Sequence, residues 1–162
     1  MKLEEIINII EDWAPLESAE DFDNVGLIVG DKSAIITKAL ITIDSLENVV
    51  DEAIEKKCNL IISFHPIIFS GLKKITRKTY VERVVSKAIK NSINIYALHT
   101  NLDNHPEGVN FQISKQLSLI DTKILIPKTG FKGGMGMIGK LKESFSEKDF
   151  LKYVKKKMKV KT

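Results

Sequence analysis

The chain has 162 residues, of which 43% are hydrophobic and 28% are charged, and its formal net charge is +4. This composition is ordinary for a globular domain with a core of its own, and no apolar run reaches the length of a membrane span. The N-terminus is acidic and amphipathic, unlike a signal peptide, and the single cysteine, Cys58, excludes an internal disulfide. We therefore expect a cytoplasmic protein with no membrane partner.

The first part of the chain alternates between helical and strand-like patterns. Apolar residues at helical spacing predict a helix over 3–13, and the run VGLIVGD (25–31) predicts a short strand. Three further apolar runs alternate with two amphipathic segments, in the order strand 38–43, helix 46–57, strand 59–63, helix 79–91 and strand 93–98. This order is typical of βαβ crossovers, so we predict an α/β fold, a three-layer sandwich built on a mostly parallel sheet.

The last part of the chain predicts a helix, two strands and a final helix. These cover 106–117, 123–126, 135–141 and a segment that Ser146 and Asp149 cap. The glycine-rich segment 127–134 is the best candidate for a hinge, and it divides the chain into predicted domains 1–126 and 127–162.

The C-terminal segment YVKKKMKVKT (153–162) carries much of the positive charge. Such a run is usually the solvated face of a helix, and we favour that interpretation over nucleic-acid binding. Its last four residues, KVKT, look like the beginning of another strand, so we expect a truncated α/β chain.

Polar side chains follow three successive predicted strands at the point where each strand ends. Asp44 follows the first, His65 the second, and His99 the third, with Asp103 four residues later. Ligands bind beyond the carboxyl ends of strands in open parallel sheets, and adjacent strands lie about 4.8 Å apart, so these groups could meet in one pocket. Histidine with aspartate is a common ligand set for zinc, iron or manganese.

Each of these residues also has an ordinary structural interpretation. A single histidine is more often a hydrogen-bonded structural residue, Asp44 could equally be the N-cap of the next helix, and Asp103 could form a turn. The loop after His65 holds four basic residues, which we interpret mainly as solvent-exposed. Its functional interpretation is attraction of an anionic substrate, such as a phosphorylated molecule.

Three segments of the chain carry a family resemblance. EDFDNVGLIVG (20–30), NLIISFHPIIF (59–69) and ALHTNLDNHPEGVN (97–110) resemble the successive signatures of the type 2 GTP cyclohydrolase I family, also called the NGG-one-interacting-factor-three-like family. The later GMGMIGKL resembles the segment that opens the second half of that family. The resemblance implies an intertwined, two-half α/β architecture, a two-metal site and a ring-shaped homo-oligomer, often a homohexamer.

The resemblance also implies roles for particular residues. His65 and Asp103 would be ligands of a divalent metal ion, and His99 would be a catalytic residue in the same pocket. Asp44, which follows the first of the parallel strands, and Asn24 are further possible pocket residues.

This sequence departs from the family pattern in two respects. The family has two histidines before the proline, but here the first of these positions is Phe64. The remaining histidine and glutamate ligands of the family lie in a C-terminal segment that this chain does not contain, so the chain resembles a short form with an incomplete second half.

Two functions remain open from the sequence. The leading hypothesis is a metal-binding, hydrolase-like protein resembling GTP cyclohydrolase I type 2 that acts on a nucleotide or another phosphorylated small molecule, with weak or absent activity in this chain. The alternative is a non-catalytic metal-binding scaffold or regulatory interaction protein, which Phe64 favours slightly.

Overall fold

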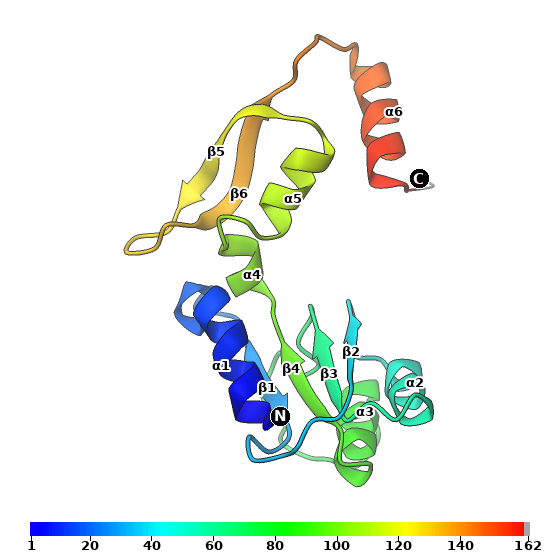
Figure 1. Ribbon diagram of the computed structural model, residues 1–162. Helices are drawn as coiled ribbons and strands as arrows, with labels where there is room; N and C mark the ends of the chain where they lie inside the picture. The colour runs from blue at the N-terminus through cyan, green and yellow to red at the C-terminus, as the bar shows by residue number, and fades with distance from the viewer. Residues whose placement is uncertain (161–162) are drawn as a thin grey trace. The chain divides into compact units, whose positions relative to one another are not determined.

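The structure, a computed structural model, describes residues 1–160 and divides into two compact units (Figure 1). The first unit is Met1–Asn101, and the second begins at Leu102. None of the helices within residues 1–160 is both long and apolar enough to cross a membrane.

The first unit is built on a four-stranded sheet with the strand order β1-β4-β3-β2. Its strands are β1 (Gly26–Val29), β2 (Ala39–Thr42), β3 (Leu60–Ser63) and β4 (Asn94–Ala97). β2 pairs with β3 and β3 with β4 in parallel, whereas β1 is antiparallel to β4. The helices α2 (Glu47–Glu55) and α3 (Tyr80–Lys90) form the crossovers between the parallel strands. The predicted βαβ units and mostly parallel sheet are therefore confirmed.

Helices cover the sheet of the first unit on both faces (Figure 1). α1 (Leu3–Trp13) packs on one face and shares a core with Leu60 and Tyr96. α2 and α3 pack on the opposite face, where their core includes Ile61 and Ile95. Because successive strand residues point to opposite faces, neighbours such as Leu60 and Ile61 enter different cores. The predicted three-layer arrangement is thus present in this unit.

Two buried or partly buried asparagines join chain segments at the amino ends of the parallel strands. The Asn94 side chain accepts a hydrogen bond from the backbone N–H of Asp31 (3.0 Å) and donates one to the carbonyl of Asn59 (2.9 Å). Asn59 in turn accepts from the N–H of Thr37 (3.0 Å) and donates to the carbonyl of Ile35 (2.8 Å). We call these two side chains the amide clasp.

The second unit contains helices and one β-hairpin. Its elements are the remainder of α4 (Thr100–Asn104), α5 (Val109–Gln116), β5 (Ile120–Pro127), β6 (Gly134–Lys140) and α6 (Glu147–Met158). The segment 127–134, predicted as a hinge, connects the paired antiparallel strands β5 and β6. The predicted boundary after residue 126 therefore falls inside a strand, whereas the compact units divide between Asn101 and Leu102.

The beginning of α5 differs from the sequence expectation. Pro106 lies in a turn, and the helix begins only at Val109 with Gly108 as its N-cap. A side chain at Gly108 would collide with the carbonyl oxygen of Leu102, so this close approach requires glycine. The predicted cap of α6 is confirmed, because the Ser146 hydroxyl accepts a hydrogen bond from the N–H of Asp149.

The strand predicted for KVKT is not observed in its described part. Lys159 takes a left-handed conformation after α6, and Val160 has no regular structure. Residues 161 and 162 of this prediction lie outside the described residues.

Candidate histidine site at the ends of the parallel strands

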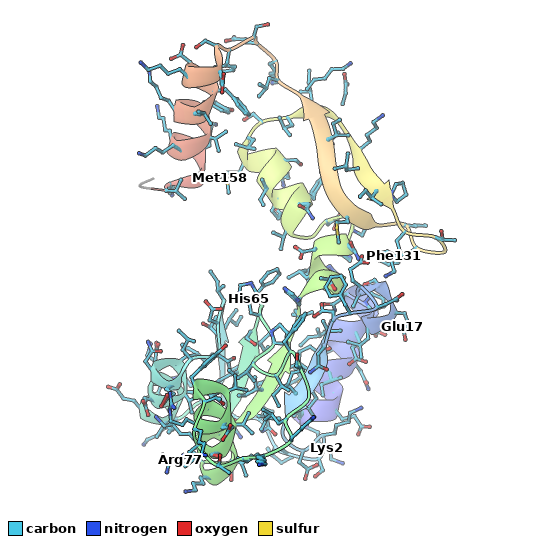
Figure 2. All side chains as sticks on the ribbon, turned by 180° about the vertical axis from the view of Figure 1, so that it is seen from behind. Lys2, Glu17, His65, Arg77, Phe131 and Met158 are labelled. Atoms are coloured by element: carbon cyan, nitrogen blue, oxygen red, sulfur yellow. The ribbon has the colours of Figure 1, made fainter. Side chains whose placement is uncertain are left out.

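The candidate site begins where β2, β3 and β4 end, and Figure 2 labels His65 at this edge of the sheet. Backbone pairing continues past the named strands: the N–H of Phe64 donates to the carbonyl of Thr42 (3.1 Å), and that of His65 donates to Ile43 (2.9 Å). The hydroxyl of Ser63 donates to the carbonyl of His65 (3.0 Å). The turn that presents His65 is therefore held by main-chain bonds to the neighbouring strand.

Asp44 orients the His65 ring. The Nδ1 of His65 lies 2.7 Å from Oδ1 of Asp44, and both side chains are about half exposed. With its Nδ1 proton directed at the carboxylate, the imidazole has its Nε2 lone pair available for a metal ion or a proton. The two residues come from the ends of adjacent parallel strands, as the sequence analysis anticipated.

Asp23 orients the second histidine, His99. The Nδ1 of His99 lies 2.9 Å from Oδ1 of Asp23, whose side chain is fully buried. The other carboxylate oxygen accepts hydrogen bonds from the backbone N–H of Thr100 (2.9 Å) and from its hydroxyl (2.5 Å).

The environment of Asp23 favours its charged form. Burial acts to raise its pKa, but the hydrogen bonds from Thr100 and His99 outweigh burial and hold the pKa below its usual value. Asp23 therefore stays ionised beside His99 and favours donation of a proton from the Nδ1 of that ring.

Sequence reasoning did not single out Asp23. It lies in the loop before the antiparallel strand β1, not at the end of a parallel strand. The signal that could have found it is its place next to Asn24 within the first family signature, EDFDN.

Three aromatic rings meet at the site. The ring centroids of His65 and His99 are 5.4 Å apart, and Phe64 lies 5.1 Å from the first and 5.3 Å from the second. All three pairs have edge-to-face geometry, the arrangement that aromatic rings favour. The structure therefore brings together three residues chosen for their position or for the family pattern: His65, His99 and Phe64.

Asn24 and Asp103, the other predicted site residues, have different surroundings. The side-chain amide of Asn24 donates to the carbonyl of Ile68 (2.6 Å) and so joins the loop before β1 to the loop after His65. Asp103 lies in α4 and belongs to the second unit, where its carbonyl accepts a hydrogen bond from the side chain of Asn110 (3.0 Å). The role of Asp103 as a metal ligand stays a prediction.

A cavity of about 760 Å³ lies along the loop that follows His65. It begins at Pro66, the next residue along the chain, and its lining includes Lys73, Lys74 and the half-exposed rings of Phe69 and Tyr80. A third exposed ring, Phe22, lies 6.5 Å from Phe69 between centroids. The loop after His65 and its neighbour Phe22 thus offer both positive charge and aromatic faces.

Glu82 of α3 fixes the shape of this loop. Its carboxylate accepts hydrogen bonds from the N–H and hydroxyl of Thr76 (2.7 and 2.8 Å), from the N–H of Lys78 (3.1 Å) and from the hydroxyl of Thr79 (3.2 Å). These bonds, led by those from Thr76, lower the pKa of Glu82 to about 2. The carboxylate is thus held ionised by the loop that it organises.

The histidine pair fits a divalent metal ion in the kind of donor that it offers. Imidazole nitrogen whose partner nitrogen faces a carboxylate is the usual arrangement of a metal-binding histidine. The number of donors is smaller than usual, because catalytic zinc sites have three protein ligands. Within residues 1–160, no group of three or more histidine, cysteine, aspartate or glutamate side chains is arranged to hold a metal ion.

The fold and the paired histidines define an α/β protein with an ionisable site at the carboxyl ends of a mostly parallel sheet. The whole chain, residues 1–162, matches the model of the family described as Duf34/NIF3 (NGG1p interacting factor 3), and the chain therefore belongs to this family. The family resemblance of the sequence motifs is confirmed.

The chain is similar to longer proteins. It is 40% identical over 162 residues to a Clostridium acetobutylicum protein named GTP cyclohydrolase 1 type 2 homolog, and the match covers 99% of this chain and 60% of that relative. The structure matches a Staphylococcus aureus protein with a TM-score of 0.91 and 27% identity, over 100% of this chain and 66% of that one. Reduced HcgD from Methanocaldococcus jannaschii matches with a TM-score of 0.82 and 31% identity, over 96% of this chain and 60% of that one. This chain thus spans about 60% of the length of the Clostridium relative.

Proposed function

We propose that this chain is the histidine-bearing part of a metal-binding, hydrolase-like protein that acts on a nucleotide. The observation that carries the proposal is the pair of histidines whose Nδ1 atoms each face a carboxylate, Asp44 for His65 and Asp23 for His99. Two such pairs side by side at the carboxyl ends of parallel strands favour a site over two unrelated structural histidines.

The residues divide into a ligand set and a proton-transfer group. His65 binds a divalent ion of zinc, iron or manganese through Nε2, and Asp103 is a second ligand in accordance with the family motif. A bound ion lowers the pKa of a coordinated water and polarises an electrophile. His99, held by the buried carboxylate of Asp23, accepts and returns a proton through its Nε2.

The loop after His65 supports a nucleotide as the substrate. Exposed aromatic faces such as Phe22 and Phe69 stack on nucleobases, and the lysines of the adjacent cavity attract phosphate groups. The Clostridium relative is named a GTP cyclohydrolase 1 type 2 homolog, so GTP is the first nucleotide to test.

Metal analysis of the purified chain tests the site. We expect zinc, iron or manganese to be retained, and we expect His65→Ala to weaken Zn²⁺ binding by roughly tenfold or more. Asp44→Asn should weaken it in the same direction without removing a ligand. The matched control is His105→Ala, which changes the third histidine of the chain. Equal metal content in the wild type and in His65→Ala would refute the site assignment.

GTP turnover separates the two functions that the site supports. Release of a ring-opened product that depends on His99 would support the hydrolase-like function. Bound metal without turnover would favour the alternative, a metal-binding scaffold, for which the small number of ligands is the supporting observation.

We also propose that the protein acts in the cytoplasm as a homo-oligomer, for which the family resemblance implies a homohexamer. The edge strand β2 supports assembly because Ile41 is 80% exposed and Ile43 is 65% exposed. Apolar side chains on an open sheet edge are typical of surfaces that another chain or segment covers.

A further inference from the structure

A second cavity, of about 690 Å³, lies in the first unit between the edge strand β1, the loop after His65 and α3. Its volume is within the range of about 300–1,000 Å³ that is usual for small-molecule sites. Asn94, the first residue of β4, belongs to its lining. The cavity therefore reaches the amino end of β4, whereas His99 follows the carboxyl end of that strand.

Most of the lining of this cavity is aliphatic. Val29, Val85 and Ile93 are buried residues of the lining, whereas Ile75 and Ile89 are more than half exposed. Water finds few hydrogen-bond partners against such a lining. A ligand that covers the exposed isoleucines removes apolar surface from water, which favours its binding. The cavity is therefore suited to an aliphatic chain.

The polar residues of the lining lie together. They are Asp31, Ser92 and Asn94. The Asn94 side chain accepts a hydrogen bond from the backbone N–H of Asp31 (3.0 Å), so the amide clasp fixes the main chain at Asp31. This contact requires glycine at the preceding position, because a Cβ on Gly30 would collide with the Asn94 carboxamide. The polar side of the cavity is thus formed before any ligand binds.

Asp31 gives the cavity a negative charge. Among residues 1–160, it is the one charged residue that lines this cavity. Its carboxylate accepts a hydrogen bond from the N–H of Ser33 (2.8 Å), and hydrogen bonds from Ser33 hold the pKa of Asp31 below its usual value. The group is therefore ionised at neutral pH. A carboxylate at an apolar cavity attracts a cationic head group and repels an anionic one.

We propose that this cavity binds an aliphatic chain that ends in an ammonium group, with the chain against Val85 and Ile89 and the ammonium group beside the Asp31 carboxylate. Fatty acids and acyl phosphates are disfavoured, because their head groups carry the same sign of charge as Asp31. The inference does not depend on the proposed metal site or on nucleotide turnover, since the lining within residues 1–160 includes no histidine.

Calorimetric titration of the full chain with three ten-carbon probes tests the proposal: decylamine, decan-1-ol and decanoate, each below its critical micelle concentration. We expect decylamine to bind most tightly and decanoate most weakly, with a difference of roughly fivefold or more between them. The methyl NMR signals of Ile75 and Ile89 should shift on binding. The signal of Ile9, which lies in α1 on the opposite face of the sheet, should not.

Two variants separate the head group from the chain. Asp31→Asn removes the charge at an exposed position, so it should bind decylamine and decanoate about equally and decan-1-ol like the wild type. Ile89→Lys places a cation among the aliphatic residues and should weaken decylamine binding by roughly tenfold. The matched control is Ile9→Lys, the same change at an exposed isoleucine of α1, which should bind all three probes like the wild type.

Three results would overturn the inference. The first is that the wild type does not bind decylamine. The second is that decylamine and decanoate bind the wild type equally, since Asp31 would then select nothing, and this comparison requires no variant to fold. The third is that Ile89→Lys binds decylamine as tightly as the wild type does, because the ligand would then occupy another surface.

Discussion

The two histidines of the site depend on carboxylates in different surroundings. The Asp44 side chain is 52% exposed, so its pair with His65 is screened by water and contributes little to folding. The Asp23 side chain is fully buried and accepts hydrogen bonds from Thr100 as well as facing His99. We infer that Asp44 serves mainly to orient His65, whereas Asp23 serves both the site and the fold.

Asp23→Asn should lower the free energy of unfolding by about 1–3 kcal/mol, because a buried charged acceptor of several hydrogen bonds is lost. The contribution of Asp23 is present above its unfolded-state pKa of 3.8 and disappears as the pH falls through its lowered folded-state value. The difference in the free energy of unfolding between variant and wild type, measured with urea, should therefore be largest at neutral pH and should shrink below about pH 4.

The control for this prediction is Asp21→Asn, an exposed carboxylate in the same loop. We expect the control to unfold like the wild type at every pH. A difference between wild type and Asp23→Asn that stays constant down to strongly acidic pH would show that the charge of Asp23 is not responsible.

At the scale of elements, the loop after His65 is hydrogen-bonded to the beginning of the next helix. Glu82 lies in the first turn of α3, and its carboxylate accepts hydrogen bonds from Thr76, Lys78 and Thr79. The end of the loop is therefore bonded to the first turn of the helix. Because the same loop carries Lys73 and Lys74, the position of the proposed phosphate-binding lysines depends on this carboxylate.

Glu82→Gln should lower the melting temperature, on the order of a few degrees, and should loosen the loop. The pKa of Glu82 is depressed from 4.5 to about 2, so its stabilising effect is present above about pH 4.5 and is lost as the pH falls toward 2. Thermal unfolding of both proteins at several pH values tests this, and hydrogen exchange of the amides of Thr76 and Lys78 reports on the loop.

The matched control for Glu82→Gln is Glu55→Gln, an exposed carboxylate at the end of α2. It should melt like the wild type. Unchanged exchange at Thr76 and Lys78 in Glu82→Gln would contradict the assigned role of the carboxylate.

The elements that sequence reasoning predicted well are those whose hydrophobic period is local. Residues 59–63 and 79–91 show clear strand and helix patterns, and β3 and α3 occupy them closely. The short helix α4 was missed because its sequence, TNLDN, is rich in residues that favour turns. The start of α5 was misplaced because it depends on the close approach of Gly108 to Leu102, which no local pattern reveals.

Sequence reasoning about the site had similar limits. The placement of Asp44, His65 and His99 at one edge of the sheet could be predicted because they follow parallel strands, where ligands bind in open sheets. Asp23 could not, because its contact with His99 joins residues 76 positions apart through the antiparallel strand β1. The ring contacts of Phe64 likewise required the three-dimensional structure.

At the scale of the whole molecule, one edge of the sheet in the first unit is open. β2 has a single neighbour, β3, and its register with β3 places Ile41 opposite Ile62 on the α1 face of the sheet. Ile41 and Ile43 are nonetheless exposed. The Clostridium relative is longer than this chain. In the proposed oligomer, we expect another chain to cover this edge.

Light scattering coupled to size exclusion tests assembly through the β2 edge. We expect the wild-type chain to elute as an oligomer and Ile41→Lys to shift toward the mass of a monomer, because a charge at the centre of an apolar contact is costly to bury. The matched control is Ile9→Lys, which changes an exposed isoleucine of α1. A monomeric wild type, or an unchanged oligomer in Ile41→Lys, would contradict this role for the edge.

The amide clasp of Asn59 and Asn94 gives the sheet two chemically different ends. Carboxamides do not titrate, so the bonds that join the amino ends of the strands keep the same strength in acid and in base. Imidazoles and carboxylates occupy the opposite ends, where protonation changes charge. The fold therefore places the hydrogen bonds of the amide clasp at one end of the parallel strands and the two imidazole–carboxylate pairs at the other.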